Sequence, residues 1–300
     1  MSRQPVRSSP RVTPLLALAF VMTALSSAEA ATPADIARGK YVFGAAGGCG
    51  CHTEKDRQVN TGGRRYDGPF GTVYSSNITP DRQTGIGAWT DEQIIAAIRL
   101  GRRPNGERIL PVHPYTVFNG MAEEDLRALV AYLRTIPAVN RANQPKRITM
   151  PLFESVFLPA WLAAFAQRET PPPKAPTAGL ARGEYLVRAV SHCGECHTPR
   201  TMTMTPDTSR FLAGTSSGPE GKAMPNITPD PETGIGKWSV EDIGTYLGSG
   251  NRPDGDVASG LMEEVIHGTT AGYKHMTPSD LAAIAAYLKS IPPVKNRITR

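Results

Sequence analysis

Apolar side chains recur at helical spacing in two segments that lie far apart along the chain. In residues 125–139 and 280–294 they follow steps of three and four, which places them on one face of a helix. These positions are Leu126, Leu129, Val130 and Leu133 in the first segment and Leu281, Ile284, Ala285 and Leu288 in the second. We therefore predict an amphipathic helix in each segment. No run of alternating apolar and polar residues predicts a substantial sheet, so the pattern indicates a mainly α protein.

Four further helices are predicted from local signals. Asp91 and Glu92 form an acidic first turn just after Trp89, and a short helix is expected at the same place after Trp238. Another helix runs through each Ala-Arg-Gly-x-Tyr segment, at residues 37–41 and 181–185. The chain has 29 glycines and 27 prolines among 300 residues, which indicates long loops between these helices.

The two halves of the chain repeat one another. "ARGKYVFGAAGGC" (37–49) matches "ARGEYLVRAVSHC" (181–193), and "NITPDRQTGIGAW" (77–89) matches "NITPDPETGIGKW" (226–238) at 10 of 13 positions. The two predicted final helices match as well. Three hundred residues are enough for about two domains, and the repeat predicts that these domains share one plan.

All four cysteines lie in two close pairs, and a histidine follows each pair. The second pair forms Cys-x-x-Cys-His, which attaches a c-type haem through two thioethers and supplies a histidine to the iron. A disulfide has no use for that histidine, and the pairs are too far apart for a compact zinc module. The repeat aligns the first pair with the second after the deletion of one residue. The predicted haem-binding residues are Cys49, Cys51, His52, Cys193, Cys196 and His197.

The shortened pair leaves the role of one cysteine open. Cys51 keeps the usual spacing to His52, so a thioether is expected at its sulfur. Cys49 lies one residue too near to Cys51 to copy the usual span. It therefore attaches through a distorted loop, remains a free thiol or does neither.

Four residues near the final helices are candidates for the sixth iron ligand. Counted from different matched motifs, His113 falls opposite Met262, and Met121 falls opposite Met276. The repeat alone does not choose between the two pairs. Met121 and Met276 stand at the start of the final helices, whereas a distal ligand needs several residues of loop to cross the haem face. We therefore expect His52, His113, His197 and Met262 to bind iron, with Met121 and Met276 as the alternatives.

The N-terminus has the pattern of an export signal. Three arginines precede an apolar stretch at residues 15–25, and Ala28-Glu29-Ala30 forms a small-x-small cleavage site. The stretch is shorter than the about 20 residues of a membrane span, although an uncleaved anchor is the alternative. Cleavage after Ala30 lowers the formal net charge of +6 by two. That charge is too small to predict nucleic-acid binding, and no basic run is interleaved with aromatic residues.

The middle of the chain differs from both repeats. "TMPLFESVFLPAWLAAFA" (149–166) is apolar and aromatic, and "RETPPPKAP" (168–176) is typical of a stiff proline linker. We expect the apolar piece to pack between the two domains. The alternative is an exposed patch that docks onto a dehydrogenase or a membrane surface. The predicted boundaries are a signal peptide at 1–30, a first domain at 31–139, a linker at 140–179 and a second domain at 180–300.

Both halves resemble class I c-type cytochrome domains. The motifs "HCGECHTPR", "NITPD", "TGIG" and "AAYLKSIPPV" are similar to those of two-haem cytochromes that serve as electron-transfer subunits of periplasmic alcohol- and aldehyde-type dehydrogenases. The resemblance covers nearly all of the chain after residue 30. It implies two tandem cytochrome c domains with two covalently attached c-type haems. It also implies a periplasmic dehydrogenase as donor and a downstream electron acceptor.

The resemblance carries over to individual residues. The family's Pro-x-Met-Pro-Tyr stands here with His113 in place of the methionine. Glycine and tyrosine of the first helix are implied to pack against an aromatic residue of the last. The matching residues are Gly39 and Tyr41 with Tyr132, and Gly183 and Tyr185 with Tyr287.

A periplasmic carrier of single electrons towards the respiratory chain is therefore the predicted function. The alternative is a two-haem enzyme acting on a small inorganic substrate such as thiosulfate or peroxide. That chemistry needs an open sixth position, whereas each distal loop offers a ligand, so electron transfer without catalysis is favoured. His192, His267 and His275 have no repeat partner and are expected to be solvated or locally hydrogen-bonded. Asn77 and Asn226 head repeated Asn-Ile-Thr loops, which are either structural turns or contacts to a haem edge.

Overall fold

A computed structural model describes residue 1 and residues 31–48, 50–166, 168–268 and 271–298. Apart from residue 1, the predicted export signal lies outside the described residues, and so does Cys49. Residues 31–300 form one compact unit. None of the described helices has both the length and the apolar character that crossing a bilayer requires.

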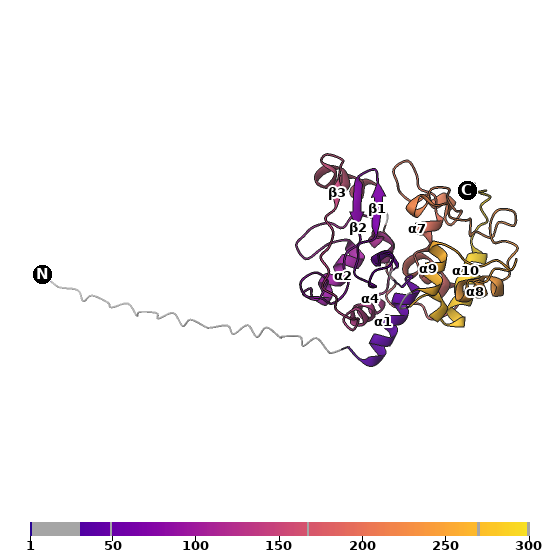
Figure 1. The fold of residues 1–300 in the computed structure, drawn as a ribbon, viewed down its shortest axis with the longest axis horizontal. Helices are drawn as coiled ribbons and strands as arrows, with labels where there is room; N and C mark the ends of the chain where they lie inside the picture. The colour runs from indigo at the N-terminus through magenta and orange to yellow at the C-terminus, as the bar shows by residue number, and fades with distance from the viewer. Residues whose placement is uncertain (2–30, 49, 167, 269–270, 299–300) are drawn as a thin grey trace. The chain divides into compact units, whose positions relative to one another are not determined.

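The order of elements follows the sequence repeat (Figure 1). The first half contains α1 (Pro33–Ala45), a 3₁₀ turn (Gly50–His52), β1 (Arg65–Gly68), β2 (Gly71–Tyr74), α2 (Asp91–Leu100), α3 (Tyr115–Phe118) and α4 (Glu123–Leu133). The middle contains β3 (Arg147–Ile148), a π-helical turn (Phe153–Phe157) and α5 (Leu158–Phe165). The second half contains α6 (Gly179–Tyr185), a π-helical turn (Leu186–Val190), α7 (Cys193–His197), 3₁₀ turns (Thr208–Arg210, Pro219–Gly221), α8 (Val240–Ser249), α9 (Leu261–His267), a 3₁₀ turn (Tyr273–His275) and α10 (Pro278–Ser290).

The predicted helices form where their end signals stand. Thr90 and Ser239 cap α2 and α8 through capping boxes, and Thr277 caps α10. In each half the first helix packs on the last, and a glycine allows the close approach. A Cβ atom at Gly39 would lie 1.9 Å from the Ala128 carbonyl oxygen, which no side chain could tolerate. Gly183 has the same relation to α10. The mainly α prediction is thus confirmed, together with the glycine contacts.

The hydroxyls of Tyr41 and Tyr185 bond across the halves, which was not predicted. Tyr185 of α6 donates to Asp125 of α4 at 2.6 Å, and Tyr41 of α1 donates to Asp280 of α10 at 2.5 Å. Each hydroxyl also accepts from a backbone N–H at the start of the same helix. We call these two reciprocal contacts the tyrosine clasps. Within the first half it is Phe43 whose ring meets Tyr132, at 5.2 Å between centroids.

A small antiparallel sheet was not predicted. It has the order β1-β2-β3, and β3 comes from the middle of the chain. Its apolar face packs with Leu110 and with Leu158 of α5. The sheet therefore holds the middle segment against the first half.

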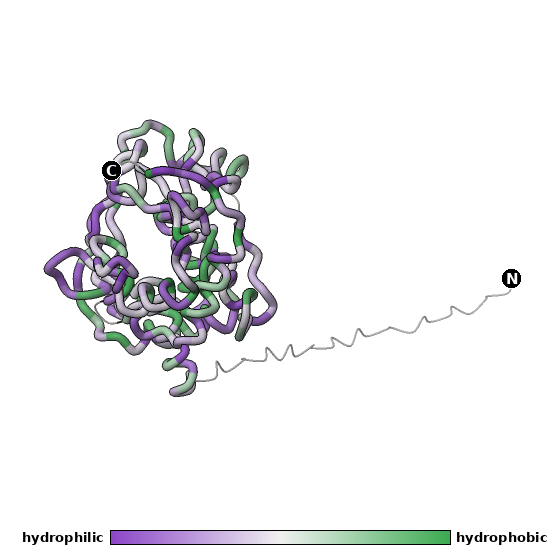
Figure 2. The backbone as a smooth tube through the Cα atoms, turned by 90° about the vertical axis from the view of Figure 1, so that its right-hand side faces the viewer, coloured by the Kyte–Doolittle hydropathy of each residue, from purple (hydrophilic) through white to green (hydrophobic). Residues whose placement is uncertain are grey.

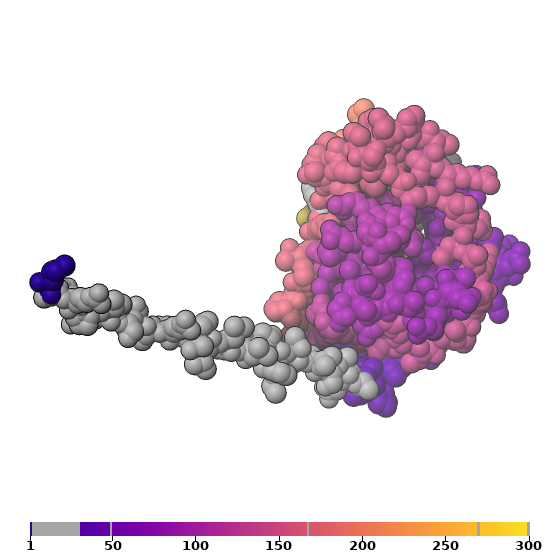
Figure 3. All heavy atoms as spheres, turned by 90° about the vertical axis from the view of Figure 1, so that its left-hand side faces the viewer, coloured from indigo at the N-terminus to yellow at the C-terminus, as the bar shows by residue number. Residues whose placement is uncertain are grey.

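Part of the middle segment packs between the halves, as expected, and part of it is exposed, as in the alternative. Leu158 is buried, and Trp161 donates from Nε1 to the Thr203 carbonyl in the second half at 2.6 Å. Leu152 and Phe157, by contrast, are more than half exposed. In Figure 3 the pink surface from the middle of the chain covers the upper part of the visible face.

One hydrophobic core cluster contains residues of both halves, among them Phe43, Leu126, Val187 and Ile284. Hydrophilic stretches occupy several of the outermost loops in Figure 2. Because the core is continuous, the two halves lie within a single packed unit. The boundary between two domains stays a prediction.

Candidate functional site

The backbone hydrogen bond that closes each attachment turn spans one residue fewer in the first half, where one residue is deleted. In the second half, the Thr198 N–H donates to the Gly194 carbonyl at 3.1 Å, an α-helical step of four residues. In the first half, the Thr53 N–H donates to the Gly50 carbonyl at 3.2 Å, a step of three. The shortened segment is therefore a 3₁₀ turn, which is tighter and has poorer hydrogen-bond geometry.

Both turns nevertheless end in a histidine that is held in the same way. His52 Nδ1 lies 2.8 Å from the Ser76 carbonyl oxygen, and His197 Nδ1 lies 2.8 Å from that of Pro225. Such a bond fixes the ring and leaves Nε2 for a metal. Burial lowers the pKa of both imidazoles. Each ring is therefore neutral at neutral pH, which is the form that binds iron.

His113 faces His52. Their ring centroids are 6.4 Å apart, and the ring planes make an angle of 76°. An imidazole nitrogen binds a metal at about 2 Å and lies about 1 Å from its ring centre, so two axial histidines have centroids about 6 Å apart. Burial and the neighbouring His52 lower the pKa of His113 to about 3, and the Ile98 backbone hydrogen-bonds to the ring. The pair has the spacing and protonation of two axial ligands.

The candidate methionines divide by where their side chains lie. Met262, the second residue of α9, is partly buried and lines the cavity that both attachment turns border. Met276 is 6% exposed within the core cluster and is not part of the cavity lining. Met121 is fully buried and does line the cavity, in the half that also offers His113.

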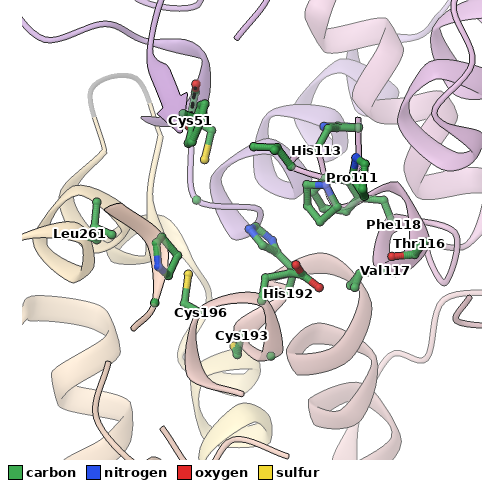
Figure 4. Close-up of a pocket in the computed structure, with 18 of the residues that line it drawn as sticks. Cys51, Pro111, His113, Thr116, Val117, Phe118, His192, Cys193, Cys196 and Leu261 are labelled. Carbon is green, nitrogen blue, oxygen red and sulfur yellow. Dashed lines mark hydrogen bonds between the residues drawn. The ribbon is translucent and has the colours of Figure 1, made fainter. Parts of the chain in front are cut away.

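A single large cavity connects the two attachment turns. Its volume is about 2970 Å³, and its lining includes Cys51, His52, Cys196 and His197. Figure 4 shows Cys51 and Cys196 on opposite sides, with their sulfur atoms directed towards the same space. A pocket for one small molecule or cofactor measures about 300–1,000 Å³. The cavity thus has room for two large cofactors, and its apolar walls fit two porphyrins.

The described cysteines are free to bind such a group. Cys51, Cys193 and Cys196 form no disulfide with one another. Burial raises the pKa of Cys193 and of Cys196 to about 12. Tyr273 hydrogen-bonds the Cys193 side chain and donates from its hydroxyl to the Ser191 carbonyl at 3.3 Å.

Several residues of the site were missed by sequence analysis. The Phe118 ring lies 5.5 Å from His113 and 5.2 Å from His192, so it stands between the two halves of the site (Figure 4). Phe118 is the repeat equivalent of Tyr273, a relation that could have drawn attention to both. Arg64 and Tyr66, which contact the shortened turn, lie in a segment with no matched counterpart.

The unmatched histidines behave largely as predicted. His192 Nδ1 lies 3.1 Å from the Val190 carbonyl, a local hydrogen bond. His267 and His275 are exposed. The Asn-Ile-Thr loops make structural hydrogen bonds and also line the cavity, so a contact to a haem edge stays a prediction. The Asn77 side chain donates to the Val139 and Arg141 carbonyls at 2.9 and 3.2 Å. Asn226 likewise donates to a carbonyl beyond α10, that of Val294, at 2.7 Å.

No protein-family model matches the chain, but several proteins of known name do. A diheme cytochrome c-type protein of Cereibacter sphaeroides is 38% identical over 269 residues, which cover 87% of this chain and 87% of that protein. The fructose dehydrogenase cytochrome subunit of Gluconobacter japonicus is 36% identical over 86% of this chain and 53% of its own length. The gluconate 2-dehydrogenase cytochrome c subunit of Pantoea cypripedii is 36% identical over 91% and 64%.

The matches to these relatives cover 86% to 91% of the chain, and the relatives differ in how much of their own length lies outside the match. The chain spans 53% to 64% of the two dehydrogenase subunits but 87% of the bacterial diheme protein. The similarity thus covers both Cys-His turns and the cavity that they border. The chain belongs to the diheme c-type cytochrome family, and its cofactors are two c-type haems.

Proposed function

We propose that this chain is an exported two-haem cytochrome that accepts single electrons from a periplasmic dehydrogenase and passes them towards the respiratory chain. The observation that carries the proposal is the shared cavity, bordered by two Cys-His turns whose histidines are oriented alike. Two iron centres in one cavity allow electrons to enter at one site and leave from the other. The names of the dehydrogenase subunits among the relatives support a dehydrogenase as donor.

In the first half, Cys51 would form a thioether and His52 and His113 would bind the iron on opposite sides. The 6.4 Å between the two ring centroids supports this assignment. In the second half, Cys193 and Cys196 would form thioethers, and His197 and Met262 would bind the iron. The position of Met262 on the cavity wall supports the choice of Met262 over Met276. Haem iron held in this way changes oxidation state by one electron without exchanging a ligand.

We also propose the boundaries predicted from the repeat. Residues 31–139 and 180–300 would be two cytochrome c domains, and residues 140–179 would join them. The duplicated hydrogen bonds of the two halves support this division. Export to the periplasm is supported by the charge and hydropathy of residues 1–30.

Mass spectrometry of the mature protein tests the haem assignment directly. We expect a chain that begins at Ala31 and carries two haems, one on a peptide containing Cys51 and one on a peptide containing Cys193 and Cys196. A single haem, or haem on the second peptide alone, would contradict the proposal. A stopped-flow experiment with a reduced periplasmic dehydrogenase then tests the transfer of electrons. Addition of thiosulfate or peroxide should leave the haem spectrum unchanged, whereas turnover of either would favour the enzymatic alternative.

A further inference from the structure

We propose that Arg64 is a positioning residue that couples the two haem sites: it braces the shortened attachment turn of the first haem and ties it to the helix that carries Met262. The inference rests on the haem sites of the proposed function. It assigns a role to a residue outside every haem motif, in a segment that the repeat does not match.

Arg64 contacts the shortened turn directly. The Gly50 carbonyl accepts the 3₁₀ hydrogen bond from Thr53 and a second one from Arg64 Nη1 at 3.0 Å. Tyr66, two residues further along, donates from its hydroxyl to the Cys51 carbonyl at 3.2 Å. A 3₁₀ turn is weaker than the α-helical turn of the second half. Because Arg64 and Tyr66 bond two of its three carbonyl groups, they fix the position of the turn from outside.

The guanidinium of Arg64 also binds two carboxylates of the second half. Arg64 Nη1 donates to Glu264 Oε2 at 2.7 Å, and Nη2 donates to Glu220 Oε1 at 2.5 Å. Glu264 lies in α9, two residues after Met262. A Cβ atom at Gly50 would lie 3.5 Å from Glu264 Oε2 and 3.8 Å from Arg64 Nη1, so the three groups meet at one point.

The guanidinium is the buried member of these ion pairs. The Arg64 side chain is 17% exposed, whereas that of Glu220 is 28% exposed and that of Glu264 is 50% exposed. Burial by itself would lower the pKa of Arg64, but the bonds to Glu264 and Glu220 outweigh it and raise that pKa. The planar guanidinium can serve a carbonyl and two carboxylates at once, which an ammonium group does less well. Removal of Arg64 would therefore take away a contact that the more exposed carboxylates of Glu264 and Glu220 share, and removal of Glu264 would leave the guanidinium with Glu220.

The residues around the Arg64–Glu264 ion pair are closely packed. Gly47 and Gly48 precede the turn and contact the segment after Met262. A Cβ atom at Gly48 would lie 1.8 Å from the Ala271 carbonyl oxygen, and one at Gly47 would lie 3.6 Å from the Val265 side chain. The attachment turn of the first haem therefore lies directly on the distal-ligand segment of the second. A displacement of either one is transmitted to the other.

The neighbouring Arg65 is a natural control. Its side chain is 62% exposed, and it pairs with Asp67 of the same strand. The variants Arg64→Leu and Arg65→Leu remove the same charge from adjacent positions, but only the first removes a contact between the two halves. Glu264→Gln and Glu263→Gln form a second matched pair on α9, because Glu263 is an exposed neighbour. Arg64→Lys keeps the positive charge but lacks the planar guanidinium, so it tests whether charge alone maintains the coupling.

The experiment measures the potential of each haem by spectroelectrochemical titration, and the methionine–iron charge-transfer band of the ferric protein. We expect Arg64→Leu to shift both potentials and to weaken the band, and Arg64→Lys to restore it in part. Glu264→Gln should weaken the band and shift mainly the potential of the second haem. Arg65→Leu and Glu263→Gln should match the parent protein.

Equal spectra and potentials in Arg64→Leu and Arg65→Leu would overturn the proposal. If Arg64→Leu does not yield folded protein, the Glu264 variants decide: identical behaviour of Glu264→Gln and Glu263→Gln overturns the coupling. The haem count of the parent protein separates this result from a failure of the proposed function. A parent with two haems and insensitive variants contradicts the role of Arg64 alone.

Discussion

His52 and His197 are held by the same hydrogen bond to a backbone carbonyl, although their attachment turns differ by one residue. The deletion falls before Cys51, so the spacing from Cys51 to His52 is kept. The tighter turn contains both Cys51 and His52, and the histidine nevertheless keeps its hydrogen bond to the Ser76 carbonyl. A thioether at Cys51 therefore needs no rearrangement of the histidine, whereas one at Cys49 would have to span a shorter path.

The first prediction concerns these two cysteines. Cys49→Ala should leave two covalent haems, because Cys51 retains its position relative to His52. Cys51→Ala should lose the haem of the first half. Peptide mapping by mass spectrometry counts the haems in each variant, and Cys193→Ala provides a comparison at the intact motif. A one-haem product from Cys49→Ala would show that both sulfurs of the shortened pair are needed.

The second prediction separates the two methionines of the second half. Met262→Ala should abolish the methionine–iron charge-transfer band of the ferric protein, because Met262 lines the cavity. Met276→Ala should leave the band in place and destabilise the fold by about 2–5 kcal/mol, as is typical of a large core residue cut to alanine. Optical spectra and chemical denaturation measure the two effects. A band lost in Met276→Ala and kept in Met262→Ala would reverse the assignment.

At the scale of elements, the tyrosine clasps join the first helix of each half to the last helix of the other. Arg38 pairs with Asp125 at 2.7 Å and Arg182 pairs with Asp280 at 2.6 Å, so each carboxylate is held by an arginine of its own half and a tyrosine of the other. Reciprocal contacts of this kind are typical of a two-fold interface between equal partners. The duplicated halves thus use a pseudo-symmetric interface within one chain.

The third prediction tests one clasp. Tyr185→Phe removes a hydroxyl that donates to the buried Asp125 and accepts from a backbone N–H. We expect a loss of about 1–3 kcal/mol in the free energy of unfolding, because a buried acceptor loses its donor. Tyr74→Phe is the control, since the described residues provide no hydrogen bond to its hydroxyl. Chemical denaturation with equal losses in both variants would contradict a specific contribution of the clasp.

The sequence predicts α1, α2, α4, α6, α8 and α10 because their signals are local, whereas α3, α5, α7 and α9 were not predicted. The apolar stripe of α4, the acidic start of α2 and the cap of α10 all lie within a few residues of the element that they define. The clasps escape prediction for a physical reason. A sequence repeat is equally compatible with contacts inside each half and with contacts between the halves. It therefore cannot show that Tyr41 bonds to Asp280 rather than to a residue of its own half.

The residues of the candidate site also divide into those that the sequence predicts and those that it does not. The spacing of cysteine and histidine predicts the haem motifs. The repeat offers two pairs of candidate ligands, and their distance along the chain from the final helices favours His113 and Met262. The link from Gly50 through Arg64 to α9 depends on the approach of Arg64, the residue before β1, to Glu264. These two residues are 200 positions apart and share no motif. Short strands such as β1 and β2, four residues each, also give too little alternation to stand out from a loop.

At the scale of the whole molecule, the two sites of one cavity differ in their expected ligands. In the proposed ligand sets, the first half would supply two histidines to its iron, and the second half would supply a histidine and a methionine. Between them lies the series of rings formed by His113, Phe118 and His192, which ends next to Cys193. The cavity is therefore asymmetric in chemistry although the halves are alike in fold.

The last prediction ties this asymmetry to the direction of electron flow. Methionine at the sixth position raises the potential of a haem relative to a second histidine. The first-half haem should then have the lower potential, so electrons would enter at residues 31–139 and leave from residues 180–300. A spectroelectrochemical titration should show two resolved steps. His113→Met should raise the lower step towards the upper one, and His267→Met, at an exposed histidine of α9, should change neither. A single step in the parent protein, or unchanged potentials in His113→Met, would remove the basis for a directed transfer.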